Sequence, residues 1–246
     1  MNRLVSGPIE AIAILLFVIT AMLFYLLSRP RVPHGPVYSA WVFVLALMVG
    51  TGARWVLAWN APGNYDRVSW QMASDVFLRG GNIYAELDRY HYSPLWFWTL
   101  GLIRRWTDSF PAVPFGVGVR LFLLSVDLAT ALTLWTWPRL SNWEKTRHAL
   151  FFYLNPVSYL LTGVHGQFEN FALFFLVLGL RLASPPLAGK SRWTAAWALG
   201  TFAVLVKQVV FFELPVLVIH FFRKGKALAL LAASAIVFFL SLASYW

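Results

Sequence analysis

Apolar stretches about as long as a bilayer is thick most strongly constrain what this chain can fold into. The longest lie at 9–27, 39–59, 112–137 and 227–246, and a helix of roughly 20 apolar residues crosses about 30 Å of hydrocarbon. Hydrophobic residues make up 59% of the chain and charged residues only 12%, which is too much apolar surface for a soluble core. Because the stretches lack the alternation of strands, the sequence predicts an all-α polytopic membrane protein.

We predict a single transmembrane domain, 1–246, of about eight helices. The expected spans are 9–27, 39–59, 112–137, 149–164, 169–184, 193–206, 208–222 and 227–246. The first could be a signal peptide, but no small-residue cleavage pattern follows it, so we interpret it as an extra N-terminal span. Lysine and arginine cluster in connections that the positive-inside rule assigns to the cytoplasm: 29–31, 139–147, 190–192 and 223–226. The net charge of +10 therefore indicates membrane orientation and not nucleic-acid binding.

The segment 60–111 falls on the opposite, extracytoplasmic side. Its residue pattern predicts a surface helix at 67–78 and a second helix at 94–103, which is too short to cross and should lie in the membrane interface. Asp66 would begin the first helix, either as its cap or as a carboxylate that accepts a proton from a hydroxyl nucleophile. Three tryptophans are expected at headgroup depth: Trp96, Trp98 and Trp106.

Two ionisable residues lie inside the third span. Arg120 and Asp127 are seven residues apart, so they share a helix face at a separation of about 10 Å. Charged groups at membrane depth are costly and seldom face lipid. We therefore expect Arg120 and Asp127 to line a polar chamber or to pair with other groups. A purely structural ion pair is the alternative interpretation.

Two further polar sites are expected at the outer surface. The fourth span ends in His165-Gly-Gln167-Phe-Glu169, which could bind sugar hydroxyls or a phosphate, contribute to a metal site or form a plain polar loop. Lys207 and Gln208 lie between two apolar segments. Lys207 either snorkels to the headgroups or holds a lipid phosphate as a point charge.

These motifs, in this order, resemble the GT-C superfamily of glycosyltransferases. Asp66-Arg-Val-Ser-Trp70, Gly80-Gly-Asn-Ile-Tyr84 and Tyr90-His-Tyr-Ser-Pro94-Leu95 are similar to the first outer loop of GPI mannosyltransferase I and of bacterial and archaeal mannosyltransferases. The segments from Arg120 to Gln208 look like those of dolichyl-phosphate-glucose-dependent glucosyltransferases. The likeness covers 39–222 and implies a GT-C-like bundle with a long first extracytoplasmic loop, 60–111. We expect the chain to be the N-terminal part of a longer enzyme, so that the chain is truncated at its C-terminus.

The resemblance implies inverting transfer of a hexose from a polyprenyl-phosphate donor to an extracytoplasmic lipid-linked glycan or other acceptor. Asp66 would deprotonate the acceptor hydroxyl, and the donor phosphate or sugar would contact Arg120, His165, Gln167 and Lys207. The other residues assigned to substrate binding are Asp75, His91, Tyr92, Asp127, Glu169 and Gln208. The resemblance requires no cofactor, and it leaves open whether the reaction uses a divalent metal ion.

A membrane transporter or a non-catalytic membrane scaffold is the alternative. A transporter predicts polar groups near the midplane and two related halves, whereas the polar groups of this chain concentrate at the outer face. The expected location is the cell membrane of a prokaryote or the endoplasmic reticulum membrane of a eukaryote, with an extracytoplasmic active site. The expected partners are the sugar donor, the glycan or glycolipid acceptor and membrane lipids.

Overall fold

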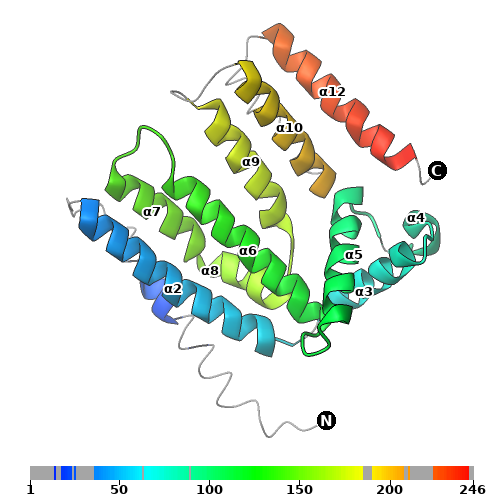
Figure 1. Ribbon diagram of the computed structural model, residues 1–246, viewed down its shortest axis with the longest axis horizontal. Coiled ribbons are helices and arrows are strands. Elements are labelled where there is room, and N and C mark those ends of the chain that lie inside the picture. Colours follow the sequence, from blue (N-terminus) through cyan, green and yellow to red (C-terminus); the bar gives the residue numbers. More distant parts are fainter. Residues whose placement is uncertain are drawn as a thin grey trace, which may run out of the picture. The chain divides into compact units, whose positions relative to one another are not determined.

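The computed structural model describes residues 18–23, 36–62, 64–88, 90–184, 190–207 and 224–243, with single positions 14, 25 and 210. Every regular element in those residues is helical (Figure 1), which confirms the all-α prediction. The expected span 208–222 and most of 9–27 lie outside the described residues. The chain forms two compact units, one of Met1–Gly63 with Val119–Asn170 and one of Asn64–Gly118 with Phe171–Trp246.

The helices divide between these two units. The first unit contains α2 (Pro36–Asn60), most of α6 (Phe115–Trp135), α7 (Asn142–Tyr153), α8 (Pro156–Ser158) and the π-helix η2 (Tyr159–His165). The second unit contains α3 (Tyr65–Leu78), α4 (Ile83–Glu86), α5 (Pro94–Ser109), most of α9 (Glu169–Ala183), α10 (Lys190–Val206) and α12 (Lys224–Ala243).

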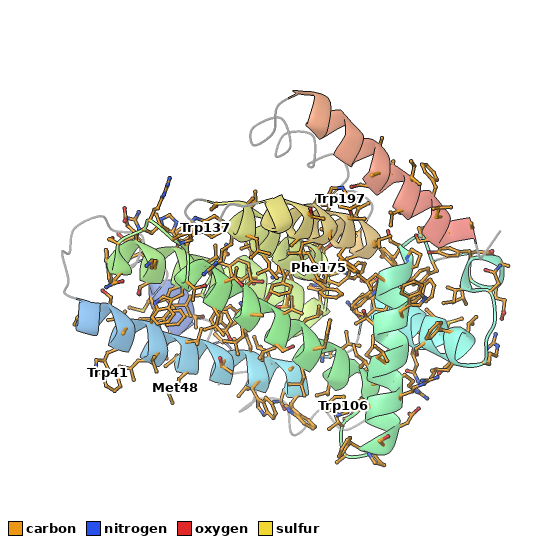
Figure 2. All side chains as sticks on the ribbon, turned by 45° about the horizontal axis from the view of Figure 1, so that its top comes forward. Trp41, Met48, Trp106, Trp137, Phe175 and Trp197 are labelled. Atoms are coloured by element: carbon orange, nitrogen blue, oxygen red, sulfur yellow. The ribbon has the colours of Figure 1, made fainter. Side chains whose placement is uncertain are left out.

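Two helices among the described residues are long and apolar enough to cross a membrane: Tyr38–Asn60 within α2 and Phe115–Trp135, which is α6. On α2, Trp41 and Met48 project from the outer side of the helix (Figure 2) and are more than half exposed. Exposed apolar surface of this kind marks contact with lipid or with another apolar partner. By length and composition, these two helices suggest association with a membrane.

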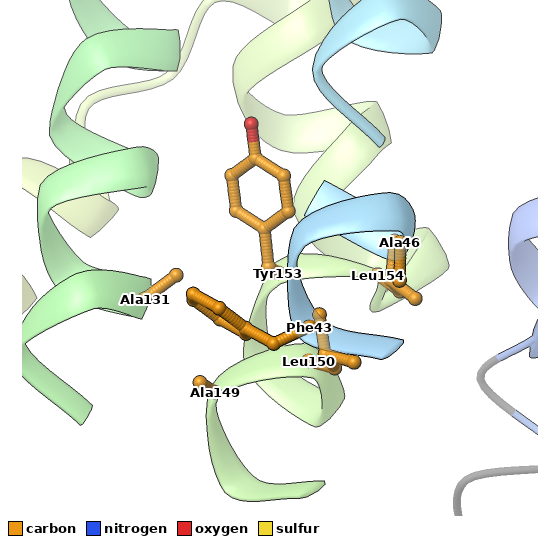
Figure 3. Close-up of a cluster of buried hydrophobic side chains, with 7 residues drawn as sticks. All are labelled: Phe43, Ala46, Ala131, Ala149, Leu150, Tyr153 and Leu154. Carbon is orange, nitrogen blue, oxygen red and sulfur yellow. The ribbon is translucent and has the colours of Figure 1, made fainter. Parts of the chain in front are cut away.

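The core of the first unit joins α2, α6 and α7 (Figure 3). The ring of Phe43 stacks on that of Trp135 with centroids 4.7 Å apart. At Gly50, a Cβ atom would lie 2.9 Å from side-chain atoms of both Leu154 and Tyr159, so glycine lets α2 approach the next helices closely. The buried members of this core are Phe43, Ala46, Ala131, Ala149, Leu150, Tyr153 and Leu154.

The single span expected at 149–164 is wrong, because the chain there forms two helical pieces. Helix α7 begins earlier, at Asn142, because Ser141 and Glu144 form a reciprocal capping box. It ends at Tyr153, and Pro156, which has no backbone N–H, then starts the short α8. The π-helix η2 continues to His165.

The second unit is built on the packing of α3 against α5. The rings of Trp70 and Trp96 meet edge to face at 5.5 Å, and Gly101 lies so close to Phe77 that a Cβ atom would be 2.3 Å from its ring. Both helices expected in this segment are confirmed, and α5 extends beyond 94–103 to Ser109. The side chain of Trp96 is fully buried between helices, and the headgroup depth expected for it stays a prediction.

Helices α9, α10 and α12 lie where the spans 169–184, 193–206 and 227–246 are expected, and their crossing of a membrane stays a prediction. Phe175 of α9 stacks on Phe202 of α10 with centroids 5.6 Å apart. Trp197 of α10 donates from Nε1 to Ser234 Oγ of α12 at 3.2 Å. The three helices therefore pack in sequence order within the second unit.

Candidate functional site

Asp127 is the centre of a buried polar network in the first unit. Its carboxylate is fully buried and accepts hydrogen bonds from Arg54 Nη1 at 2.6 Å, from Thr162 Oγ1 at 2.7 Å and from Asn170 Nδ2 at 2.7 Å. Asn170 also donates to Ser158 Oγ at 3.0 Å. The network thus joins α2, α6, α8, η2 and the first turn of α9.

Arg54 donates a hydrogen bond to a backbone carbonyl at the break between α7 and α8. Val157 N donates to Asn155 Oδ1 at 2.9 Å, and the carbonyl of Tyr153 accepts from Arg54 Nη2 at 2.7 Å. The guanidinium also lies over the rings of Tyr153 and Tyr159, at 4.8 and 4.3 Å from their centroids. The guanidinium of Arg54 therefore stabilises the helix break, and the carbonyl of Tyr153 and the two rings in turn hold the guanidinium beside Asp127.

Sequence reasoning identified Asp127 but missed Arg54. Arg54 is itself an ionisable residue inside the expected span 39–59, so the rule that singled out Arg120 and Asp127 would have found it. Taking one carboxylate or guanidinium out of water costs several kcal/mol, which only a close partner and further hydrogen bonds offset. Asp127 has both, in agreement with the expectation that it lines a polar chamber or pairs with other groups.

Arg120 fixes the end of α2. Its guanidinium is buried and donates to the carbonyls of Ala58 at 3.1 Å, Ala61 at 3.0 Å and Pro62 at 2.7 Å. The last carbonyls of a helix have no partner within the helix, and basic side chains satisfy them well. This geometry gives Arg120 a structural role where the chain leaves α2 for the segment that carries Asp66, and its contact with a donor phosphate stays a prediction.

The polar turn after η2 is attached to the buried network. His165 is exposed at the end of η2, and Gly166 closes that helix with a φ of 70°, a left-handed conformation that suits glycine. Gln167 N donates to Leu161 O at 2.7 Å, and Gln167 and Glu169 are partly buried. Because Asn170 follows Glu169 and bonds Asp127, the turn is held close to the ion pair.

In the second unit, Asp66 lies in the first turn of α3 and is partly buried. The helix cap is Asn64, whose Oδ1 accepts from Arg67 N at 3.1 Å. The interpretation of Asp66 as the cap is therefore wrong. Arg67 packs across Gly116, where a Cβ atom would lie 2.3 Å from Arg67 Cδ.

A pocket of about 210 Å³ opens beside α3. Ser69 contributes to it one helical turn after Asp66, and side chains three residues apart are neighbours on a helix. The lining is mixed, with two carboxylates, a hydroxyl and an aromatic ring. The lining residues are Ser69, Met72, Glu86, Leu87, Asp88 and Tyr90.

The other assigned residues of this unit lie on α3, just before α5 and just after α10. Asp75 is about half exposed, with Arg104 Nη2 at 3.7 Å. His91 is exposed, and the carbonyl of Tyr92 accepts from Tyr84 Oη at 2.8 Å. Lys207 directly follows α10 and is partly buried, while Gln208 lies outside the described residues.

In the second unit, the start of α5 contacts both α10 and α3. Ser93 Oγ donates to Val204 O at 3.2 Å, which joins the start of α5 to the end of α10. Trp70, one turn after Asp66 on α3, meets Trp96 near the same end of α5, with ring centroids 5.5 Å apart.

The described residues thus define an all-helical protein with two helices of membrane-spanning length, a buried ion pair and a polar pocket beside α3. Within the described ranges, no group of three His, Asp or Glu side chains is placed to hold a metal ion. Comparison with protein-family models, with curated proteins and with solved structures finds no match.

Proposed function

We propose that this protein is an integral, multi-pass membrane glycosyltransferase that transfers a hexose from a polyprenyl-phosphate donor to an extracytoplasmic lipid-linked glycan or other acceptor. The observation that carries the proposal is the position of Asp66, one helical turn from a polar pocket, with the capping of α3 performed by Asn64. A carboxylate one helical turn from a pocket is suited to act as a general base on a substrate that extends from it.

In the proposed reaction, the acceptor hydroxyl binds in the pocket beside α3. Asp66 takes the hydroxyl proton as the oxygen bonds to the anomeric carbon, and the bond from that carbon to the phosphate oxygen breaks with inversion. The polyprenyl phosphate leaves with the electron pair, and a nearby cation would stabilise its charge. Glu86 and Asp88 of the pocket offer acceptors for neighbouring sugar hydroxyls.

Phosphate binding by Lys207 would place the donor at the end of α10. Ser93 Oγ, at the start of α5, donates to Val204 O of α10, and Trp70 of α3 meets Trp96 near the same end of α5. Lys207→Gln should raise KM for the donor, because it removes the cation proposed to hold the phosphate, and an unchanged KM would remove Lys207 from the site.

The membrane arrangement proposed with this function is a bundle of about eight spans with the segment 60–111 outside the cytoplasm. Helices α2 and α6 support it by length and composition. A lipid-linked donor needs a bilayer beside the site for its tail and water at the reacting carbon, and an interfacial loop provides both. The proposed location is the cell membrane of a prokaryote or the endoplasmic reticulum membrane of a eukaryote.

The test uses purified protein, polyprenyl-phosphate mannose or glucose and a glycolipid acceptor. Asp66→Asn should lower the transfer rate by at least about 100-fold, the usual scale for loss of a general base. Asp108→Asn is the matched control, because Asp108 is an exposed carboxylate on α5, and it should leave the rate unchanged. Transfer from neither donor, or an unchanged rate in Asp66→Asn, would contradict the proposal.

A transporter is the second candidate, favoured by one specific observation. The Arg54–Asp127 pair lies beside a helix broken at Asn155 and Pro156, and buried charges beside discontinuous helices mark substrate sites in transporters. Uptake of a labelled solute into proteoliposomes that is abolished by Asp127→Asn would favour transport. Transfer activity without any uptake would favour the glycosyltransferase.

A further inference from the structure

A second pocket lies in the first unit, where α2 and α7 begin and α6 ends. Its volume of about 340 Å³ is within the usual range for small-ligand sites. It is separate from the Asp127 network and from the pocket beside α3. The lining residues are Ser39, Ala40, Trp135, Thr136, Asn142 and Lys145.

The polar groups of this pocket favour an anion. Lys145 is partly buried, and within the described part of the chain its ammonium group has no ion-pair partner. Asn142 is the first residue of α7, so the pocket also lies at the positive end of that helix dipole. None of the described lining residues is acidic, and Glu144, the acid next to Lys145, accepts from Ser141 N at 2.8 Å in the capping box.

One wall of the pocket is a fixed aromatic ring. Trp135 stacks on Phe43 with an interplanar angle of 1°, and its Nε1 donates to Thr146 Oγ1 at 3.3 Å. Beyond the pocket, Val44 lies four residues after the lining residue Ala40, so the two share a face of α2, and the exposed side chain of Val44 continues the pocket with apolar surface along α2. A ligand with a charged head and a hydrocarbon tail would satisfy both surfaces.

The position of the pocket in the chain indicates a membrane surface. It lies at the ends of the two helices of membrane-spanning length, beside a connection that carries Arg139, Lys145 and Arg147 against the single acid Glu144. Basic residues beside a span attract anionic lipids at the cytoplasmic leaflet. A free phosphate would use the cation but would leave the apolar surface of α2 unused.

We propose that this pocket binds the phosphate of an anionic phospholipid headgroup at the cytoplasmic surface, with the acyl chains along α2. The proposal does not depend on the glycosyltransferase activity, so either can fail without the other.

The test is native mass spectrometry of the purified protein titrated with phosphatidylglycerol and, separately, with phosphatidylcholine. Lys145→Gln should weaken binding of phosphatidylglycerol about five-fold, the effect of one lysine close to an anionic lipid surface. Arg139→Asn is the matched control, because it removes the same charge from the same connection and asparagine tolerates the φ of 66° at this position. It should change binding by less than about two-fold, since Arg139 does not line the pocket.

Three results would overturn the proposal. Equal losses in the two variants would mean diffuse attraction by the basic connection. Equal binding of phosphatidylcholine by the wild type would mean that the negative charge of the headgroup is not recognised, and displacement of the lipid by equimolar inorganic phosphate would mean a site for free anions. Should Lys145→Gln fail to fold, Asn142→Leu decides, because it fills the pocket at an exposed position and should also weaken phosphatidylglycerol binding.

Discussion

Removing the Arg54 side chain should destabilise the first unit strongly. Arg54→Met leaves the fully buried Asp127 without the guanidinium that lies 2.6 Å away. Loss of one partner of a buried ion pair costs about 3–5 kcal/mol. We expect the upper part of that range, because the carbonyl of Tyr153 also loses its donor, and an unsatisfied buried group costs about 1–3 kcal/mol by itself.

Thermal unfolding of the purified protein in one fixed detergent measures this loss. For a chain of this size, 1 kcal/mol shifts the Tm by about 2–4 °C, so Arg54→Met should lower the Tm by about 10 °C or more. Arg104→Met is the matched control. Its ion pairs with Asp75 at 3.7 Å and with Asp108 at 3.1 Å are partly exposed, and each such pair contributes less than about 1 kcal/mol.

The double variant Arg54→Met with Asp127→Leu separates charge from packing. Replacing both members of a buried pair by apolar residues is often neutral, so the double variant should regain most of the lost Tm. A Tm for Arg54→Met within about 2 °C of wild type would refute the reasoning, since that shift corresponds to less than about 1 kcal/mol. A double variant less stable than the single variant would also refute it.

Three further predictions concern the helices around the site. Gly101→Ala would place its Cβ 2.3 Å from the ring of Phe77 and should cost about 1–3 kcal/mol by overpacking, measured as a lower Tm that Phe77→Leu partly restores. Asn64→Ala removes the cap of α3 and should cost about 1 kcal/mol, seen as faster amide exchange in the first turn of α3 with the rest of the unit unchanged. Hydrogen bonds with the side chain and, second, the backbone N–H of Ser141 lower the pKa of Glu144 below its usual value. The capping box therefore stabilises α7 fully above the usual pKa of a glutamate. That stabilisation is lost as the pH falls through the lowered pKa. Amide exchange at the start of α7 should accelerate over that interval, and Glu144→Gln should abolish the pH dependence.

The helical character of the chain could be predicted because it depends on local pattern. The amphipathic spacing of 67–78 and the proline at the start of 94–103 are local signals, and α3 and α5 lie where those signals place them. Hydrophobicity alone predicts one continuous helix at 149–164. The helix is interrupted there because Pro156 has no backbone N–H. Asn64 and Asp66 are equally good caps, so composition alone does not decide which one begins α3.

The candidate site was less predictable, because its partners are distant in sequence. Arg54 and Asp127 are brought together by the packing of α2 on α6, and Arg120 finds carbonyls at the end of α2. Sequence spacing predicted that Asp127 needs a partner, since a buried charge is costly. It does not indicate which residue provides one, and the basic pattern around Lys145 indicates membrane orientation without indicating the pocket that this residue lines.

The sidedness of the membrane arrangement can be measured with single cysteines, because the chain has none of its own. Tyr65→Cys, His165→Cys and Lys207→Cys should react with a membrane-impermeant maleimide added outside intact cells or to sealed luminal-side-out vesicles. Asn142→Cys should react only after permeabilisation. If the first three positions label from opposite sides of the bilayer, no single compartment can hold both the acceptor hydroxyl and the donor phosphate, and the transferase proposal fails.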